Sequence, residues 1–63
     1  MLCEIGEHYK LQVVINERLI TYTATILGRD ATHLVFKDRD GKTIQVKEAD
    51  IVFSEKLKEL MKL

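Results

Sequence analysis

The sequence Asp-Arg-Asp-Gly at residues 38–41 lies between two short runs in which apolar and polar residues alternate. An Asp-Gly pair in this setting is a strong signal for a β-hairpin, because glycine accepts the positive φ that a tight turn requires. The flanking runs predict strands at residues 33–37 and 43–47. The residues expected to face a core are Leu34, Phe36, Ile44 and Val46. This hairpin commits the chain to antiparallel β structure.

The alternation of apolar and polar residues extends along most of the remaining chain. Alternating apolar residues predict strands at 8–15 and 19–27, separated by a polar turn at 16–18. Gly28 interrupts the second of these runs and predicts a bend or turn at residues 28–31. A tight turn at 48–50 then leads into a short apolar strand at 51–53.

The last residues change to a helical period. Ser54 can cap the first turn of a helix, since its hydroxyl can accept from a free backbone N–H. Leu57, Leu60 and Met61 follow at i, i+3 and i+4, which predicts an amphipathic helix at about 55–62. A helix of about two turns is too short to be stable alone. We therefore expect its apolar face to cover an open end of the sheet or to contact a partner chain.

Five short strands, tight turns and one terminal helix predict an all-β fold with a small α element. The most economical arrangement is a five-stranded SH3-like barrel, because closure removes exposed sheet edges. An open five-stranded sheet capped by the helix is the alternative.

The chain has 63 residues, which is enough for a single small domain, here spanning residues 1–63. A domain of this size buries only about 60% of its unfolded surface and commonly needs a disulfide, a metal or a partner subunit. Cys3 is the one cysteine, so no internal disulfide can form, and no Cys/His spacing predicts a zinc site. We therefore expect a homo-oligomer without metal or cofactor.

Ten basic and ten acidic residues give a net charge of zero. This balance argues against a protein that coats nucleic acid through bulk charge, so a nucleic-acid site would have to be local. A lone cysteine without a signal-peptide pattern predicts a cytoplasmic protein. Apolar runs of only a few residues predict no membrane span.

Residues 26–38, Ile-Leu-Gly-Arg-Asp-Ala-Thr-His-Leu-Val-Phe-Lys-Asp, resemble the first signature of the Sm-like RNA-binding family. In that family a strand ends near a glycine, an aspartate follows, and a short loop leads into an apolar strand. Residues 46–51 occupy the place of the second signature, with Lys47 and Glu48 where the family has an Arg-Gly pair, and His33 stands where an asparagine is usual. The resemblance covers about residues 9–53 and implies a self-associating barrel that binds RNA. The outline is also similar to that of the archaeal SH3-like chromatin proteins, which are strongly basic.

By this resemblance, the candidate nucleic-acid-binding residues are Arg29, Asp30, His33 and Lys47. A base would stack on His33 and bind Asp30, while the basic side chains meet phosphates. Simpler structural roles are open for each of them: Asp30 as a turn former, Arg29 as a solvated charge and His33 as an outward strand residue.

A non-enzymatic module with no nucleic-acid ligand is the alternative function. It would dock a partner chain through Leu57, Leu60 and Met61 or through an edge of the barrel. Duplex DNA is a third option. Catalysis is not expected, because neither histidine has a serine or cysteine partner in the sequence pattern and Cys3 lies beside Glu4, which raises a thiol pKa. Lys37, Arg39, Lys42 and Lys47 could form a basic patch, although acidic residues between them favour ion pairing on a solvated face.

Overall fold

The computed structural model describes residues 3–58 as one antiparallel sheet with the strand order β4-β3-β2-β1-β5. The elements are β1 (His8–Ile15), β2 (Arg18–Arg29), β3 (His33–Lys37), β4 (Thr43–Lys47), the 3₁₀ turn η1 (Glu48–Asp50) and β5 (Ile51–Leu57). The predicted all-β class is confirmed. The bounds predicted for the first, third and fourth strands agree with the structure.

Two tight turns fix the register of the hairpins. Asn16 and Glu17 join β1 to β2 with φ of 52° and 66°, the positive values that a two-residue turn needs to match strand twist. Between β3 and β4, Oδ1 of Asp38 accepts hydrogen bonds from the backbone N–H groups of Asp40 and Lys42, each at 2.9 Å. Gly41 follows with a φ of 85°. The predicted Asp-Gly hairpin is confirmed.

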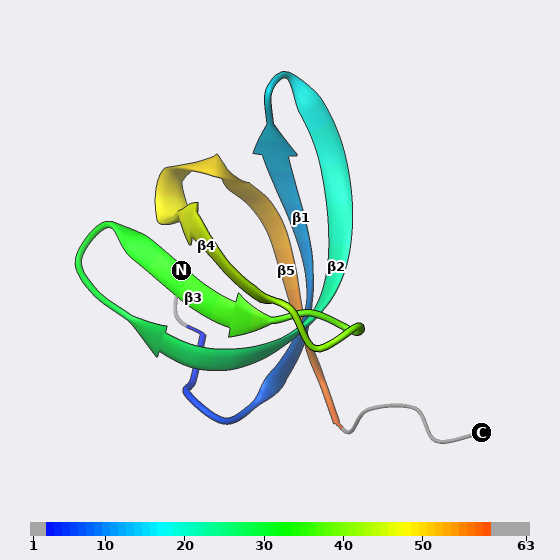
Figure 1. Ribbon diagram of the computed structural model, residues 1–63, viewed down its shortest axis with the longest axis vertical. Helices are drawn as coiled ribbons and strands as arrows, with labels where there is room; N and C mark the ends of the chain where they lie inside the picture. The colour runs from blue at the N-terminus through cyan, green and yellow to red at the C-terminus, as the bar shows by residue number, and fades with distance from the viewer. Residues whose placement is uncertain (1–2, 59–63) are drawn as a thin grey trace.

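Strand β2 is longer than its predicted range and passes through Gly28 (Figure 1). The β2–β3 register shifts between Ile26 and Gly28, which leaves Leu27 as the extra residue of a β-bulge. A bulge bends a strand without ending it, and a glycine within a strand often marks such a bulge. The predicted end of this strand at residue 27 is therefore wrong, because Gly28 and Arg29 belong to β2; of the bend or turn predicted at Gly28, the structure shows the bend.

Strand β5 overturns the predicted start of the terminal helix. Residues 54–57 continue the strand, and Ser54 and Leu57 pair with Leu11 and His8 of β1. An isolated helix of two turns has little stability of its own. As a strand, residues 54–57 instead satisfy the hydrogen-bonding groups of the backbone along the edge of β1. The strand is therefore formed in place of the predicted helix. Leu60 and Met61 lie outside the described residues.

The core occupies the concave side of the sheet. All five strands contribute inward side chains, and the largest fully buried ones are Phe36, Leu11, Ile26, Leu34 and Val13. The Phe36 ring meets the Tyr22 ring edge to face, with centroids 5.1 Å apart. All four inward residues predicted for the β3–β4 hairpin belong to this cluster, with Ile44 only partly buried.

The residues before β1 connect the start of the chain to the middle of the sheet. The N–H of Gly6 donates to the Ile26 carbonyl at 2.8 Å, and the N–H of Ile26 donates to the Glu7 carbonyl at 3.0 Å. The ammonium of Lys56 in β5 donates to Oε1 of Glu4 at 2.9 Å. The ion pair joins this segment to the β5 edge.

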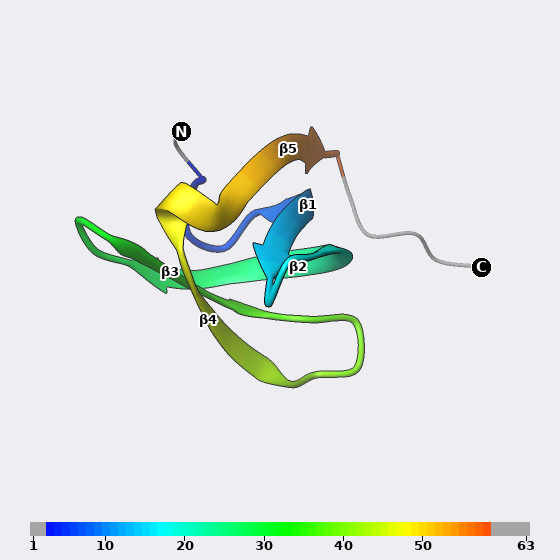
Figure 2. The same ribbon diagram turned by 90° about the horizontal axis from the view of Figure 1, so that it is seen from above.

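The sheet is strongly curved, and η1 turns the chain from β4 into β5 at its corner (Figure 2). A closed barrel would add a hydrogen-bonded ladder between β4 and β5. The pairings found within residues 3–58 instead leave these two strands at opposite edges of one sheet.

Candidate functional site

The two segments that the sequence analysis singled out meet at one corner of the sheet. The backbone N–H of Glu48, at the start of η1, donates to the carbonyl of Thr32 in the β2–β3 loop at 2.8 Å. This hydrogen bond joins residues 16 positions apart in the sequence. It places the β2–β3 loop directly against the corner where β4 ends.

Asp30 organises the loop itself. Its Oδ1 accepts from the backbone N–H groups of Thr32, at 2.8 Å, and His33, at 2.7 Å. The N–H of Asp30 in turn donates to the His33 carbonyl at 3.0 Å. The hydrogen bonds from Thr32 and then His33 lower the pKa of the Asp30 carboxyl. Because Oδ1 is occupied in this way, Asp30 holds the loop in shape and has only its second oxygen free for a ligand.

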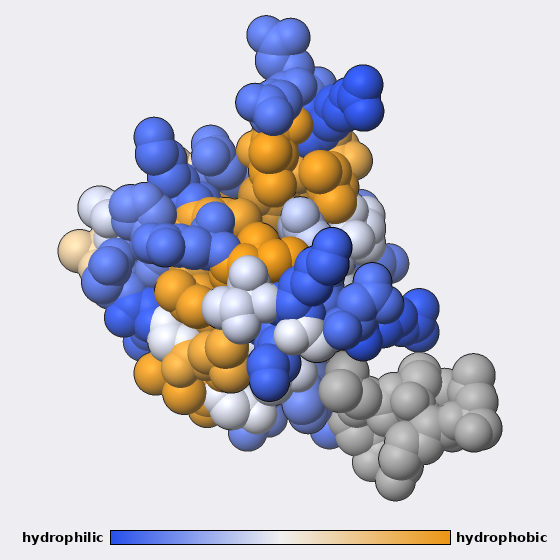
Figure 3. Space-filling view, viewed as in Figure 1, coloured by the Kyte–Doolittle hydropathy of each residue, from blue (hydrophilic) through white to orange (hydrophobic). Residues whose placement is uncertain are grey.

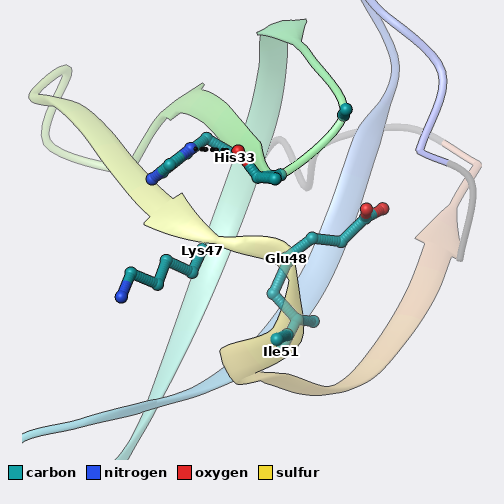
Figure 4. A pocket seen from close by; sticks show the side chains of 7 residues that line it. His33, Lys47, Glu48 and Ile51 are labelled. Atoms are coloured by element: carbon teal, nitrogen blue, oxygen red, sulfur yellow. Dashed lines mark hydrogen bonds between the residues drawn. The ribbon is translucent and has the colours of Figure 1, made fainter.

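His33 and Lys47 are directly opposite each other on β3 and β4. Cross-strand partners share a face of the sheet, and both side chains point the same way in Figure 4. Nδ1 of His33 lies 2.7 Å from Oγ1 of Thr32, a contact that orients the ring. The His33 side chain is 34% exposed. It therefore offers part of an aromatic face beside a lysine ammonium.

Glu48 takes a different direction from its neighbour Lys47. Its carboxylate points away from His33 and Lys47 in Figure 4. It raises the pKa of the buried Cys3 thiol, although burial is the larger cause. The backbone of Glu48 therefore belongs to the corner, while its negative charge faces the N-terminal segment.

Two hollows flank the pair formed by His33 and Lys47. The larger, of about 770 Å³, lies between the β2–β3 loop and η1; its lining residues are Ala31, Thr32, His33, Lys47, Glu48, Ala49 and Ile51. The second, of about 500 Å³, also contacts His33 and Lys47 and extends to the end of β1 at Val14 and Ile15. Volumes of this order are sufficient for a small planar ligand.

Arg29 does not join this group. It is the register partner of Leu34, whose side chain is buried, so it belongs to the opposite face of the sheet from His33. The bulge at Leu27 causes this, because one extra residue changes the face of every residue that follows it. The positive charge of Arg29 acts on Cys3, where it opposes the rise in the pKa of the thiol.

The structure thus brings together Asp30, His33 and Lys47 of the four predicted site residues. It adds Thr32 and the backbone of Glu48, which sequence reasoning missed because their contact is non-local and has no sequence signature. Of the predicted partner-contact residues, Leu57 lies on the outward face of β5 opposite His8 and is half-buried; Leu60 and Met61 are outside the described residues.

Within residues 3–58, no group of three or more histidine, cysteine and acidic side chains is arranged to hold a metal ion. That part of the chain also has no helix long and apolar enough to cross a membrane. No protein-family model, curated protein or solved structure matches this chain. Its function must be argued from its own geometry.

Proposed function

We propose that this chain is a non-enzymatic small-barrel module that self-associates and binds single-stranded nucleic acid, RNA or DNA, at the corner formed by the β2–β3 loop and η1. The observation that supports this most is the hydrogen bond from the N–H of Glu48 to the carbonyl of Thr32, at 2.8 Å. It holds the β2–β3 loop against η1, and the hollow of about 770 Å³ between them lies beside His33 and Lys47, which the β3–β4 register places opposite each other.

Each residue of the corner has a role in this proposal. A base inserted into the larger hollow stacks on the exposed face of His33, since aromatic stacking accepts any base. The Lys47 ammonium binds an adjacent phosphate. Asp30 keeps the loop in the conformation that presents His33, with its second carboxylate oxygen free to accept from a base. Arg29 has no part in the contact, because it belongs to the other face.

Closure of the sheet into an SH3-like, Sm-like barrel is part of the proposal. The strand order β4-β3-β2-β1-β5 places at the two edges the strands that closure would join, and η1 already connects them. The bulge in the long strand β2 bends it, so that it can pair with β1 and with β3 on the two sides of a barrel. A cytoplasmic location agrees with the single cysteine, Cys3, which is free and buried in the core.

The test is fluorescence anisotropy with labelled U-rich and A-rich oligonucleotides of ten residues at low salt. We expect binding that weakens at least about fivefold in His33→Ala and in Lys47→Gln, since base stacking alone contributes ~1–3 kcal/mol. Arg29→Gln removes the same charge as Lys47→Gln from the opposite face and should bind like the wild type. If the wild type binds neither the U-rich nor the A-rich probe at low salt, the proposal is overturned.

Self-association without a nucleic-acid ligand is the second candidate function, and an exposed apolar group on the outward face of β1, β2 and β5 favours it. Its members, with their exposed fractions, are Val14 (37%), Leu19 (59%) and Phe53 (42%). Val14 and Leu19 are register partners, and Phe53 lies opposite Gln12 on the same face. Exposed apolar groups of this kind mark protein interfaces.

The partner that fits this surface best is a second copy of the chain, because a 63-residue domain has a small core and because, within residues 3–58, no strand pairs with the outer edges of β4 and β5. Light scattering should give a mass above 7.3 kDa for the wild type. Leu19→Ser together with Phe53→Ser should shift the mass towards the monomer, while Thr21→Ser on the same face should not. A monomeric wild type would exclude this candidate.

A further inference from the structure

The outward face of the sheet carries more basic than acidic residues, although the net charge of the chain is zero. The alternation of burial along the strands places Lys10, Lys37 and Lys47 on the outward face, together with His8 and His33. Of the acidic residues within 3–58, only Glu55 shares that face. The others lie in the N-terminal segment, the turns and η1; they are Glu4, Glu7, Glu17, Asp30, Asp38, Asp40, Glu48 and Asp50.

The register connects these basic residues into one path. His8 of β1 is the partner of Thr25 in β2, and Thr25 is the partner of Lys37 in β3. Nδ1 of His8 lies 3.0 Å from Oγ1 of Thr25. Lys10 lies two residues along β1 from His8, and His33 lies four residues along β3 from Lys37. All of them occupy the same face.

The path is long enough for a polymer. Strands are separated by about 4.8 Å and residues along a strand by about 3.3 Å, so the path from Lys10 to the pair of His33 and Lys47 covers about 30 Å. A path of this length suits a chain of several nucleotides, comparable with the ~4–16 nucleotides that bind one OB-fold domain.

The lysines of the path have no acidic partner that would compete with a phosphate. Within residues 3–58, neither Lys10, Lys37 nor Lys47 has an acidic side-chain atom within 4.0 Å; the ion pairs there involve Lys56 and His33. Glu55 is the register partner of Lys10 but forms no ion pair with it. The ion pairing that was expected to neutralise a basic patch around β3 and β4 is therefore not found for Lys37 or Lys47 in this part of the chain.

We infer that the outward face of the sheet is a track for the sugar-phosphate backbone of a single nucleic-acid strand. The strand enters at His33 and Lys47, continues past Lys37, and crosses β2 and β1 at Thr25 and His8 to reach Lys10. This inference rests on the proposed function and adds phosphate contacts on β3 and β1.

The shape of the sheet selects a single strand over a duplex. The core lies on the concave side, so the face that carries the path is convex (Figures 1 and 2). A duplex has a persistence length of about 50 nm and would touch a convex surface over only a short distance. A flexible single strand can follow the curvature.

Apolar side chains border the track at one end. In Figure 3 hydrophobic residues gather over the upper ends of β1 and β2, and hydrophilic side chains surround them. Near the β1–β2 turn, the exposed pair Val14 and Leu19 lies beyond Lys10 on the far side of Gln12 and Thr21. The basic path therefore ends at Lys10.

The test measures affinity against salt concentration for a labelled twelve-nucleotide oligo-U and for a trinucleotide. Each phosphate neutralised on a single strand contributes about −0.7 to the slope of log K against log salt. We expect a slope near −2 for the longer probe, and a slope shallower by about 0.7 in Lys10→Gln and in Lys37→Gln. With unchanged affinity at 1 M salt, each variant would bind about eightfold more weakly at 50 mM salt.

Arg18→Gln is the matched control, because Arg18 is an exposed cation beside the β1–β2 turn and away from the path. It should leave both slope and affinity unchanged. The trinucleotide occupies only the corner, so it should respond to His33→Ala and not to Lys10→Gln.

Two results would overturn the track. If the trinucleotide binds through His33 while Lys10→Gln and Lys37→Gln leave the slope for the longer probe unchanged, the track is wrong and the corner site stands. If neither probe binds the wild type at 50 mM salt, the corner site and the track both fail.

Discussion

Replacing Phe36 by leucine should lower the free energy of unfolding by about 0.5–3 kcal/mol. Phe36 is fully buried, and its ring meets Tyr22 edge to face at 5.1 Å. Losing such an aromatic pair costs about 0.5–1.5 kcal/mol, and the changed side-chain shape in a packed core adds up to about 1.5 kcal/mol. A domain of this size has a total stability of roughly 3–9 kcal/mol, so the variant should still fold at 25 °C.

The measurement is urea denaturation followed by circular dichroism, with thermal unfolding as a second readout. A loss of 1 kcal/mol corresponds to a melting temperature lower by about 4–8 °C in a domain of this size. Phe53, the other phenylalanine, is 42% exposed. Phe53→Leu is therefore the matched control and should change stability by less than about 0.5 kcal/mol. Equal losses in the two variants would refute the assignment of the concave face as the core.

Three further predictions concern local features. At neutral pH, Asp30→Asn should lower the melting temperature, because the folded-state pKa of Asp30 lies below its ordinary value of 3.8. The stabilisation by the carboxylate is present above pH 3.8 and is lost as pH falls through the folded-state pKa. The difference in melting temperature between the variant and the wild type should therefore disappear in thermal scans at low pH. A gap that is independent of pH would contradict this role. Gly41→Ala should cost about 1–2 kcal/mol in urea denaturation, since φ is 85° and strain is the only penalty, whereas Gly28→Ala, with equal space and no positive φ, should be tolerated. The Cys3 thiol, whose pKa is raised mainly by burial, should react with a thiol-specific dye slowly in the folded protein and quickly in urea; equal rates would place Cys3 outside the core.

Strands β1, β3 and β4 were predictable because apolar residues recur at every second position along them and because turn residues mark their ends. The Asp-Gly hairpin needs only local chemistry, namely the side chain of Asp38 and the freedom of Gly41. Where local signals agree with tertiary structure, the sequence alone is sufficient.

The errors lie where pairing over long sequence distances decided the outcome. Residues 54–57 carry the beginning of a helical period, but they complete the ladder with β1 more than 40 residues away. The bulge at Leu27 could not be predicted from the sequence either, since its position depends on the register between β2 and β3. It moved Arg29 to the other face and so removed one of the four predicted site residues.

The candidate site was predictable only in part. The sequence indicated His33 and Lys47 as outward residues, each near a segment that resembles one of the two Sm-like signatures. The register of β3 and β4 places them opposite each other. The hydrogen bond between Glu48 and Thr32 that holds the corner together could not be foreseen, because a backbone contact between distant residues depends on the fold rather than on side-chain type. The same is true of the excess of basic over acidic residues on the outward face of the sheet, which a net charge of zero conceals.

The most direct test of the corner site is a titration of the ¹⁵N-labelled protein with a short oligo-U, followed through backbone amide chemical shifts. The site predicts that the amides of Thr32, His33, Lys47 and Glu48 shift first and most, with the amides of Asp40 and Gly41 at the β3–β4 turn, the far end of that hairpin, unchanged. Shifts that leave the corner unaffected, or no shifts at saturating oligonucleotide and low salt, would contradict the proposed function.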